Sequence, residues 1–427
     1  MTWQNWGHTY SATPKREVAP DDTDQICEIV AAARKTGSTV KTVGAGHSFS
    51  AIAVPGDTLL RLTNLRGVVG VDGDQVTLRA GTHLHEIPAL LAPYGLAMTN
   101  LGDIDKQTVA GATSTGTHGT GLQFGGISTQ ITALELVTGT GELRTVTEPG
   151  ELQAAAMGLG ALGVVTTITL RCVPAFSIEA VEGPARIDDV LADFARSVEQ
   201  TDHFEFYWFP HTEAALTKHN RRIPGLVAAT GPSPIRRYID DELLSNKVFG
   251  AICRLGAAVP AVVPRINNIS GNVLSGRTIV DASASVFTSD RSVRFREMEY
   301  ALPLERIPEA FDGVRKVIAD KGYRVSFPIE IRTAAADDLM LSTAAGRQSG
   351  YIAVHRYFRD QPDGYFRDVE AVMTQLGGRP HWGKMHTRDA DYLRTVYPRF
   401  DEFRRVRDQF DPDRVFANDY LRQVLGG

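Results

Sequence analysis

The stretch Val43-Gly-Ala-Gly-His-Ser-Phe-Ser50 is the segment from which the rest of this sequence can be interpreted. It follows a β-type run from Ser38 to Val43, and its small residues let backbone N–H groups approach a phosphate closely. It lacks the third glycine of a Rossmann fingerprint and the Gly-Lys-Ser/Thr of a Walker loop. Taken alone, the stretch predicts either a dinucleotide-binding loop or an ordinary turn.

Two further runs of small residues lie downstream. Residues Val109 to Gly121 are almost all Gly, Thr, Ser or Ala around His118, and a Gly-Leu-Gly-Ala-Leu-Gly run leads from Gly158 into an apolar strand at Val164. Such a loop can wrap an extended ligand with backbone and hydroxyl donors, although a flexible surface loop has a similar composition. Three such runs in order favour a nucleotide-type ligand over three unrelated turns.

The periodicity of apolar residues predicts an α+β chain of more than one domain, as its 427 residues also suggest. The first part alternates helix and strand signals, with a helix that begins after Asp22 and ends at Gly37 and another over residues 84–91. After Pro174 the pattern predicts an antiparallel sheet with helices. Its expected strands cover 203–209, 293–301, 324–332 and 351–358, and its expected helices cover 307–321, 365–376 and 392–410.

We therefore expect an N-terminal ligand-binding domain over 1–174, made of two α/β subdomains. A second domain over 175–405 follows, and a tail over 406–427 returns to the first.

The composition excludes several classes of protein. The net charge of −5 argues against a nucleic-acid partner. Cys27, Cys172 and Cys253 are too widely spaced for a disulfide framework or a zinc site, so we expect no metal and a reducing cytoplasmic location. The N-terminus has no signal-peptide pattern, and the apolar stretch from Val248 to Pro264 is too short and too interrupted for stable membrane insertion.

Charged residues in the second half form a candidate site. Glu330 and Arg332 are two apart on an expected strand, so they share a face. His355 and Tyr357 share a face of another expected strand, and Lys384 closes the stretch His381-Trp-Gly-Lys. Each of these signals also has a purely structural interpretation. Glu330 and Arg332 could form a simple ion pair, His355 could be a core histidine, and Lys384 could be a surface lysine.

In combination, these motifs resemble the vanillyl-alcohol-oxidase-type FAD flavoproteins, and within them the aldonolactone oxidoreductases and alditol oxidases. Gly-His-Ser at 46–48, Gly-Thr-His-Gly-Thr-Gly at 116–121, Leu-Gly-Ala-Leu-Gly-Val-Val at 159–165 and His-Trp-Gly-Lys at 381–384 occur in the family order. The resemblance covers almost the whole chain.

The resemblance implies that His47 carries FAD covalently through the 8α-methyl group. It also implies that a set of residues contacts the cofactor: Gly44, Ala45, Gly46, Ser48, Thr108, Gly111, Thr115, Gly116, Thr117, His118, Val165 and His381. Lys384, Glu330 and Arg332 are the implied catalytic residues, with Lys384 stabilising charge that develops during hydride transfer to flavin N5. These three, with Asp103, His355 and Tyr357, are the implied substrate contacts.

The implied reaction is oxidation of a hydroxyl of L-gulono-, L-galactono- or D-arabinono-1,4-lactone, with reoxidation by O2, giving H2O2, or by another acceptor. An alditol oxidase acting on xylitol or sorbitol is one alternative, and a non-catalytic flavin-containing sugar-binding protein is another. Alditol oxidases tend to have Ala-Ser where this chain has Gly102-Asp103. Gly102 favours a lactone enzyme, and Asp103 departs from the serine that contacts the substrate in alditol oxidases. The sequence leaves the oligomeric state and the natural electron acceptor open.

Overall fold

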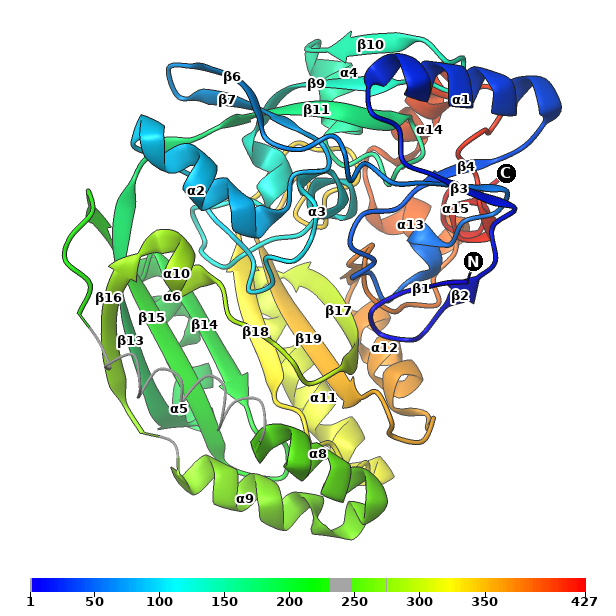
Figure 1. The fold of residues 1–427 in the computed structure, drawn as a ribbon. Coiled ribbons are helices and arrows are strands. Elements are labelled where there is room, and N and C mark those ends of the chain that lie inside the picture. Colours follow the sequence, from blue (N-terminus) through cyan, green and yellow to red (C-terminus); the bar gives the residue numbers. More distant parts are fainter. Residues whose placement is uncertain (1, 231–247, 274) are drawn as a thin grey trace.

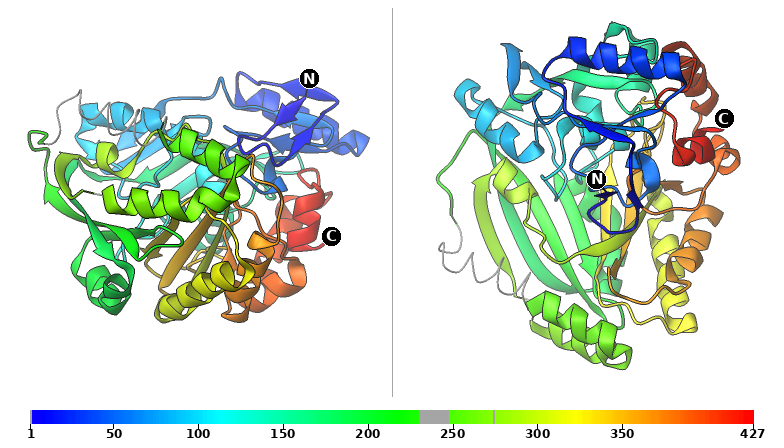
Figure 2. Two further views of the ribbon diagram at one scale, coloured as in Figure 1. Left: turned by 90° about the horizontal axis from the view of Figure 1, so that it is seen from below. Right: turned by 45° about the vertical axis from the view of Figure 1, so that its right-hand side comes forward.

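The computed structural model describes residues 2–230, 248–273 and 275–427, and these residues pack around two large apolar cores. The first core is built mostly from residues 26–172, and the second mostly from residues 187–373. An eight-stranded sheet lies between the N-terminal part and a layer of helices (Figure 2). This arrangement confirms the predicted α+β fold with an antiparallel sheet in its second half.

Two small sheets belong to the first core. A parallel sheet of order β3-β5-β4 joins Arg16–Val18, Thr58–Leu60 and Val40–Thr42, and α1 (Thr23–Thr36) precedes β4. Helix α1 begins at the Asp22 cap and ends where Gly37 takes a left-handed conformation, as its sequence predicts. The second sheet has the order β10-β9-β11-β7-β6 and consists of Leu143–Val146, Ile131–Val137, Val164–Arg171, Gln75–Arg79 and Val68–Asp72.

The large sheet has the order β16-β13-β15-β14-β18-β19-β17-β20 and is antiparallel throughout (Figure 1). Its strands are, in that order, Arg277–Ala282, Phe176–Arg186, Ala214–Pro224, His203–Trp208, Ile329–Ala334, Ser349–Tyr357, Phe295–Pro303 and Arg379–Pro380. Alternate side chains point to opposite faces of a strand. Phe206, Ile331 and Val354 therefore pack on α11 (Ile307–Lys321) and α12 (Tyr365–Gln375), and the opposite face meets the N-terminal part.

The remaining elements connect or cover these sheets. The short strands are β1 (Trp3–Gln4), β2 (Ser11–Ala12), β8 (Leu96–Ala97) and β12 (Val173–Pro174). The helices are α2 (Ile87–Leu91), α4 (Pro149–Ala155), α5 (Ile187–Ala192), α6 (Phe194–Gln200), α8 (Phe249–Ala258), α9 (Val263–Val273), α10 (Ser283–Phe287) and α15 (Asp419–Leu425).

Three elements differ from the sequence prediction. The strand expected over 324–332 begins only at Ile329, since β18 covers Ile329–Ala334. The run after Thr108, expected as a loop, begins with helix α3 (Val109–Thr115), which Thr108 caps and which ends at left-handed Gly116. The single helix expected over 392–410 is two helices, α13 (Ala390–Val396) and α14 (Phe400–Phe410). Pro398 lies between them, and a proline in a helix interior removes a hydrogen bond and clashes with the preceding turn.

The chain returns to the first core near its end. Trp382, Leu393 and Phe403 already belong to that core, as do the buried residues of α15. Leu339, Met340 and Leu341, from the second half, also pack there. The domain limits at 174 and 405 stay a prediction, since the first core draws on residues before 406.

Candidate active site

The polar face of the large sheet gathers the charged residues of the candidate site. Tyr207 of β14 is opposite Glu330 of β18 in register, and Glu297 of β17 is opposite His355 of β19. Glu205, Arg332 and Glu299 occupy further positions of the same face. A buried face that carries acids and bases is costly unless the groups pair with one another, and here they do.

Glu330 and Arg332 form an ion pair, as their spacing predicts. The Nε of Arg332 also donates to Glu205 Oε2 at 2.9 Å, and the Tyr207 hydroxyl donates to Glu330 Oε1 at 3.1 Å. Burial raises the pKa of Glu330, although Arg332 acts in the opposite direction. The cluster therefore offers both a cation and a carboxyl with several hydrogen-bonding atoms to a polyhydroxylated ligand.

Lys384 lies on the same face and is not a surface lysine. Its ammonium pairs with Glu297, whose other oxygen lies 3.5 Å from His355 Nε2. Burial disfavours the charge of Glu297, but Lys384 and the hydrogen bond from His355 hold its pKa at about 2. His355 Nδ1 is 3.2 Å from the carbonyl of Pro328, which can only accept, so this nitrogen carries a proton.

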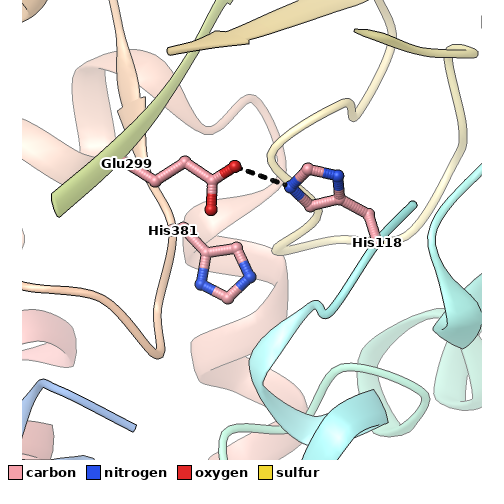
Figure 3. Close-up of side chains that lie close together, drawn as sticks. All are labelled: His118, Glu299 and His381. Carbon is pink, nitrogen blue, oxygen red and sulfur yellow. Dashed lines mark hydrogen bonds and ion pairs between the residues drawn. The ribbon is translucent and has the colours of Figure 1, made fainter. Parts of the chain in front are cut away.

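His118, Glu299 and His381 form a second buried cluster, shown in Figure 3. His118 Nδ1 donates to the Gly119 carbonyl at 2.8 Å, and its Nε2 is 3.1 Å from Glu299 Oε1. Burial opposes ionisation of Glu299, but His118 lowers the pKa of this carboxyl well below its usual range. The ionised carboxylate accepts from His118 Nε2, so both nitrogens of that ring donate.

Two histidines and a carboxylate could also hold a metal ion, but the hydrogen bonds of His381 do not favour this use. Its Nδ1 accepts from the Gly383 N–H at 3.1 Å, so Nε2 carries the proton of the neutral ring. Burial lowers the pKa of His381 to about 4, which keeps it neutral. A metal would need the Nε2 lone pair that this proton occupies.

His47 lies on the loop that faces this sheet. Its ring stacks on Trp6 with centroids 5.4 Å apart, and among the described residues it makes no hydrogen bond. Burial, with a smaller contribution from Lys384, lowers its pKa to about 4. The imidazole is therefore neutral at physiological pH, and the ring nitrogen that carries no proton is available as a nucleophile.

The loop is held directly against the stretch that carries Lys384. The Phe49 N–H donates to the Gly383 carbonyl at 2.6 Å, and the Ser50 hydroxyl donates to the Trp382 carbonyl at 2.7 Å. Lys384 Nζ lies 5.4 Å from the centroid of the Phe49 ring. His47 and Lys384 therefore belong to one site, although 337 positions separate them in the chain.

The backbone of residues 44–48 has the donors that a flavin dinucleotide needs. Within the described part of the chain, none of these five N–H groups reaches a protein acceptor, whereas Val43 and Phe49 on either side both do. Gly46 has a φ of 72°, which glycine adopts without strain. Consecutive free N–H groups bind anions and electron-rich ring edges, so the loop fits an FAD cofactor.

The expected contacts of the second loop lie on and after α3. The Thr108 side chain accepts from Gly111 N–H at 3.2 Å, and a Cβ on Gly44 would lie 2.5 Å from Thr108 Oγ1. Thr115, Gly116 and Thr117 form the end of this helix, directly before His118. The structure therefore brings the loop at 44–48 and the run at 108–118 together.

Three expected contacts lie further out. Val165 is at the start of β11, at the edge of the first core. Tyr357 is buried in a cluster with Phe49, Phe295 and Phe327. The Asp103 carboxylate is in contact with Ser289 and Arg291, outside the sheet. The roles expected for these residues stay predictions.

Sequence reasoning missed Glu205, Tyr207, Glu297 and Glu299 of this face. The signal was present, because Glu-Phe-Tyr at 205–207 and Glu-Met-Glu at 297–299 alternate polar and apolar side chains within predicted strands. Only the strand order shows that these acids meet the motif residues.

Comparison with known proteins defines first the class and then the family. Residues 14–147 match the family described as "FAD binding domain", which makes this an FAD-binding protein. Residues 168–424 match "D-arabinono-1,4-lactone oxidase", and the chain belongs to this family of oxidoreductases.

Curated relatives extend over the full length. The chain is 40% identical over 426 residues to L-gulono-1,4-lactone dehydrogenase of Mycobacterium tuberculosis (strain H37Rv), covering 99% of both chains. It is 32% identical to L-gulonolactone oxidase of Scyliorhinus torazame, covering 99% of this chain and 98% of the relative.

Solved structures agree on the fold alone. Cholesterol oxidase from B. sterolicum superimposes with a TM-score of 0.82 at 19% identity, covering 99% of this chain and 96% of that chain. Among the helices that the structure describes, none is both long enough and apolar enough to cross a bilayer.

Proposed function

We propose that this protein oxidises the C2 hydroxyl of an aldono-1,4-lactone with FAD that is linked covalently to His47. The observation that carries the proposal is the single site formed by the His47 loop, the Lys384–Glu297–His355 group and the Glu330–Arg332 pair. The relatives named as gulonolactone dehydrogenase and oxidase support the substrate class. When bound, FAD supplies the two-electron oxidant.

The residues of the chain have separate tasks in this proposal. Arg332 donates hydrogen bonds to lactone oxygens, and Glu330 accepts from its hydroxyls and orients Arg332. The Lys384 ammonium stabilises negative charge that develops as the substrate is oxidised, and it interacts with the hydroxyl oxygen that loses its proton. His381 contributes a ring N–H donor at the cofactor, and His118 holds Glu299 beside it.

The covalent link is consistent with the state of His47. The neutral, half-buried imidazole of His47, which has no hydrogen-bond partner among the described residues, would hold FAD through a C–N bond to the 8α-carbon. Forming this link would give up one C–H and one N–H bond, and the two electrons would pass to the flavin ring, which the electron acceptor then reoxidises. Acid precipitation of the purified protein should leave yellow flavin in the pellet, and His47→Ala should release it to the supernatant. Flavin that leaves the native protein on acid treatment would contradict the link.

The reaction is tested by anaerobic mixing with L-gulono-1,4-lactone, D-arabinono-1,4-lactone and xylitol, while the flavin absorbance is followed. We expect a lactone to bleach the flavin and xylitol to have little effect. Lys384→Met should lower the rate of bleaching at least 100-fold with flavin still bound, whereas an unchanged rate would remove Lys384 from the mechanism. Mixing the reduced protein with O2 or with a dye then identifies the acceptor.

A further inference from the structure

The segment between α10 and β17, residues 288–294, crosses the polar face of the sheet (Figure 1). We call this segment the strap. It contributes no residue to the motifs by which the sequence was interpreted. Its position over β18 and β19 nevertheless places it beside the proposed substrate site.

The strap is attached to the N-terminal part of the molecule through Asp103. The Ser289 N–H donates to the Asp103 carbonyl at 3.0 Å, and the Ser289 hydroxyl donates to Asp103 Oδ1. The Nε of Arg291 donates to Asp103 Oδ2 at 3.0 Å. A second ion pair joins Lys106 to Asp290 at 3.0 Å. Both carboxylate oxygens of Asp103 are therefore occupied by the strap.

Arg291 lies at one end of the site. Besides Asp103, the groups that influence the ionisation of Arg291 include Tyr207 of β14, which burial keeps neutral, and Glu330 of β18. Lys384 lies at the other end, against Glu297 of β17 and His355 of β19. In the strand order, β18 lies between β14 and β17. A lactone bound at Glu330 and Arg332 of β18 therefore has Lys384 on one side and Arg291 on the other.

The Arg291 side chain is partly exposed to solvent. It is 40% exposed although charged groups of the site surround it. Within the described residues its only hydrogen bond is the one from Nε, so the two terminal nitrogens remain as donors. A guanidinium held through Nε presents these two nitrogens in a fixed, planar arrangement.

We propose that Arg291 is a specificity-determining residue that binds the exocyclic hydroxyls of the lactone, and that Asp103 positions it. The inference rests on the proposed function and names the part of the substrate that this end of the site recognises. A hexono-1,4-lactone carries a two-carbon exocyclic chain, whereas a pentono-1,4-lactone carries one carbon. Arg291 therefore favours the longer lactone.

The test uses the holoenzyme with L-gulono-1,4-lactone and D-arabinono-1,4-lactone as substrates. Arg291→Gln should raise KM for the gulonolactone at least 10-fold with kcat within about twofold, because the lost hydrogen bonds are the same in the ground and transition states. KM for the arabinonolactone should change less than threefold. An equal effect on both lactones, or none, would overturn the assignment.

A matched control is Arg394→Gln. Arg394 also donates through Nε to an aspartate at 3.0 Å and is 42% exposed, but its partner is Asp401 on α14. This variant should leave KM and kcat unchanged. A similar rise in KM would mean that the Arg291 effect is not local.

A double-variant cycle separates positioning from a merely structural role. Asp103→Asn should raise KM for the gulonolactone with kcat preserved, and adding it to Arg291→Gln should cause no further rise, because Asp103 acts through Arg291. Additive effects would contradict the positioning role.

Failure of this inference can be told apart from failure of the proposed function. If no lactone reduces the flavin of the wild-type protein, the proposed function fails. If the wild-type protein reacts and Arg291→Gln behaves in the same way, only this inference fails.

Discussion

At the residue scale, the site depends on two carboxylates of one strand, β17, and each of them pairs with groups from other segments. Glu297 contacts both Lys384 and His355, and two positions further along β17, Glu299 contacts His118. These carboxylates stay ionised despite burial because each has a cationic or hydrogen-bond-donating partner. In the proposed function, Glu297 is therefore a positioning residue that holds Lys384 and His355 with one side chain.

Glu297→Gln should slow flavin reduction by the lactone about 10- to 100-fold, since the amide cannot pair with the Lys384 ammonium. The pH profile of the reduction should also differ from that of wild type, because Glu297 holds both Lys384 and His355 in place. The Glu297→Asp variant, which keeps the negative charge, should retain more of the wild-type rate than Glu297→Gln does. Stopped-flow reduction over pH 6–10 measures both effects.

Glu370→Gln is the matched control for loss of a buried carboxyl. Glu370 is 2% exposed and accepts from the hydroxyl of Tyr300, on the opposite face of the same strand. Its loss should leave the pH profile of reduction unchanged. A profile that shifts equally in both variants would indicate a general structural effect.

At the scale of elements, two segments far apart in the chain build the cofactor cradle by direct contact. The loop at 44–48 lies on the N-terminus of α3, and Gly44 is closest to the capping residue Thr108. No side chain has space at Gly44 without moving the cap.

Gly44→Ala should lower the flavin content of the purified protein several-fold, because the new methyl would lie 2.5 Å from Thr108 Oγ1. Absorbance at 450 nm relative to 280 nm measures the flavin content. Adding Thr108→Ala removes the clashing oxygen, at a cost of about 1 kcal/mol in helix capping and of one expected cofactor contact, so the double variant should regain part of the flavin. Gly150→Ala, where a methyl meets nothing within 4 Å, should bind flavin as wild type does. No recovery in the double variant would show that the clash is not the cause.

At the scale of the whole molecule, burial of neutral histidines makes stability depend on pH. Burial is the largest cause that lowers the pKa of His203, His211, His381 and His386 to about 4. In the unfolded chain these rings take up protons near pH 6.5, so between about pH 4 and 6.5 the unfolded state binds more protons than the folded state. Stability therefore falls as the pH falls through this window.

The apparent Tm at pH 5 should be lower than at pH 7 by at least about 5 °C, as measured by calorimetry. His211→Asn removes one of these groups away from the site and should reduce the difference. Asparagine suits this position because His211 has a φ of 71°. Equal Tm values at pH 5 and pH 7 would contradict the assignment of buried neutral rings.

The sequence by itself determined the local elements and the residue types that the chemistry needs. Apolar periodicity predicted α1 and α11 with their ends, and the motifs indicated His47, Glu330, Arg332 and Lys384, because these signals act over a few neighbouring residues. The tertiary structure alone decided that β17 brings Glu297 to Lys384, that the His47 loop meets Gly383, and that the strap sets Arg291 on Asp103. Strand order and long-range packing fix these contacts, and alternation along a single strand carries no information about its neighbours.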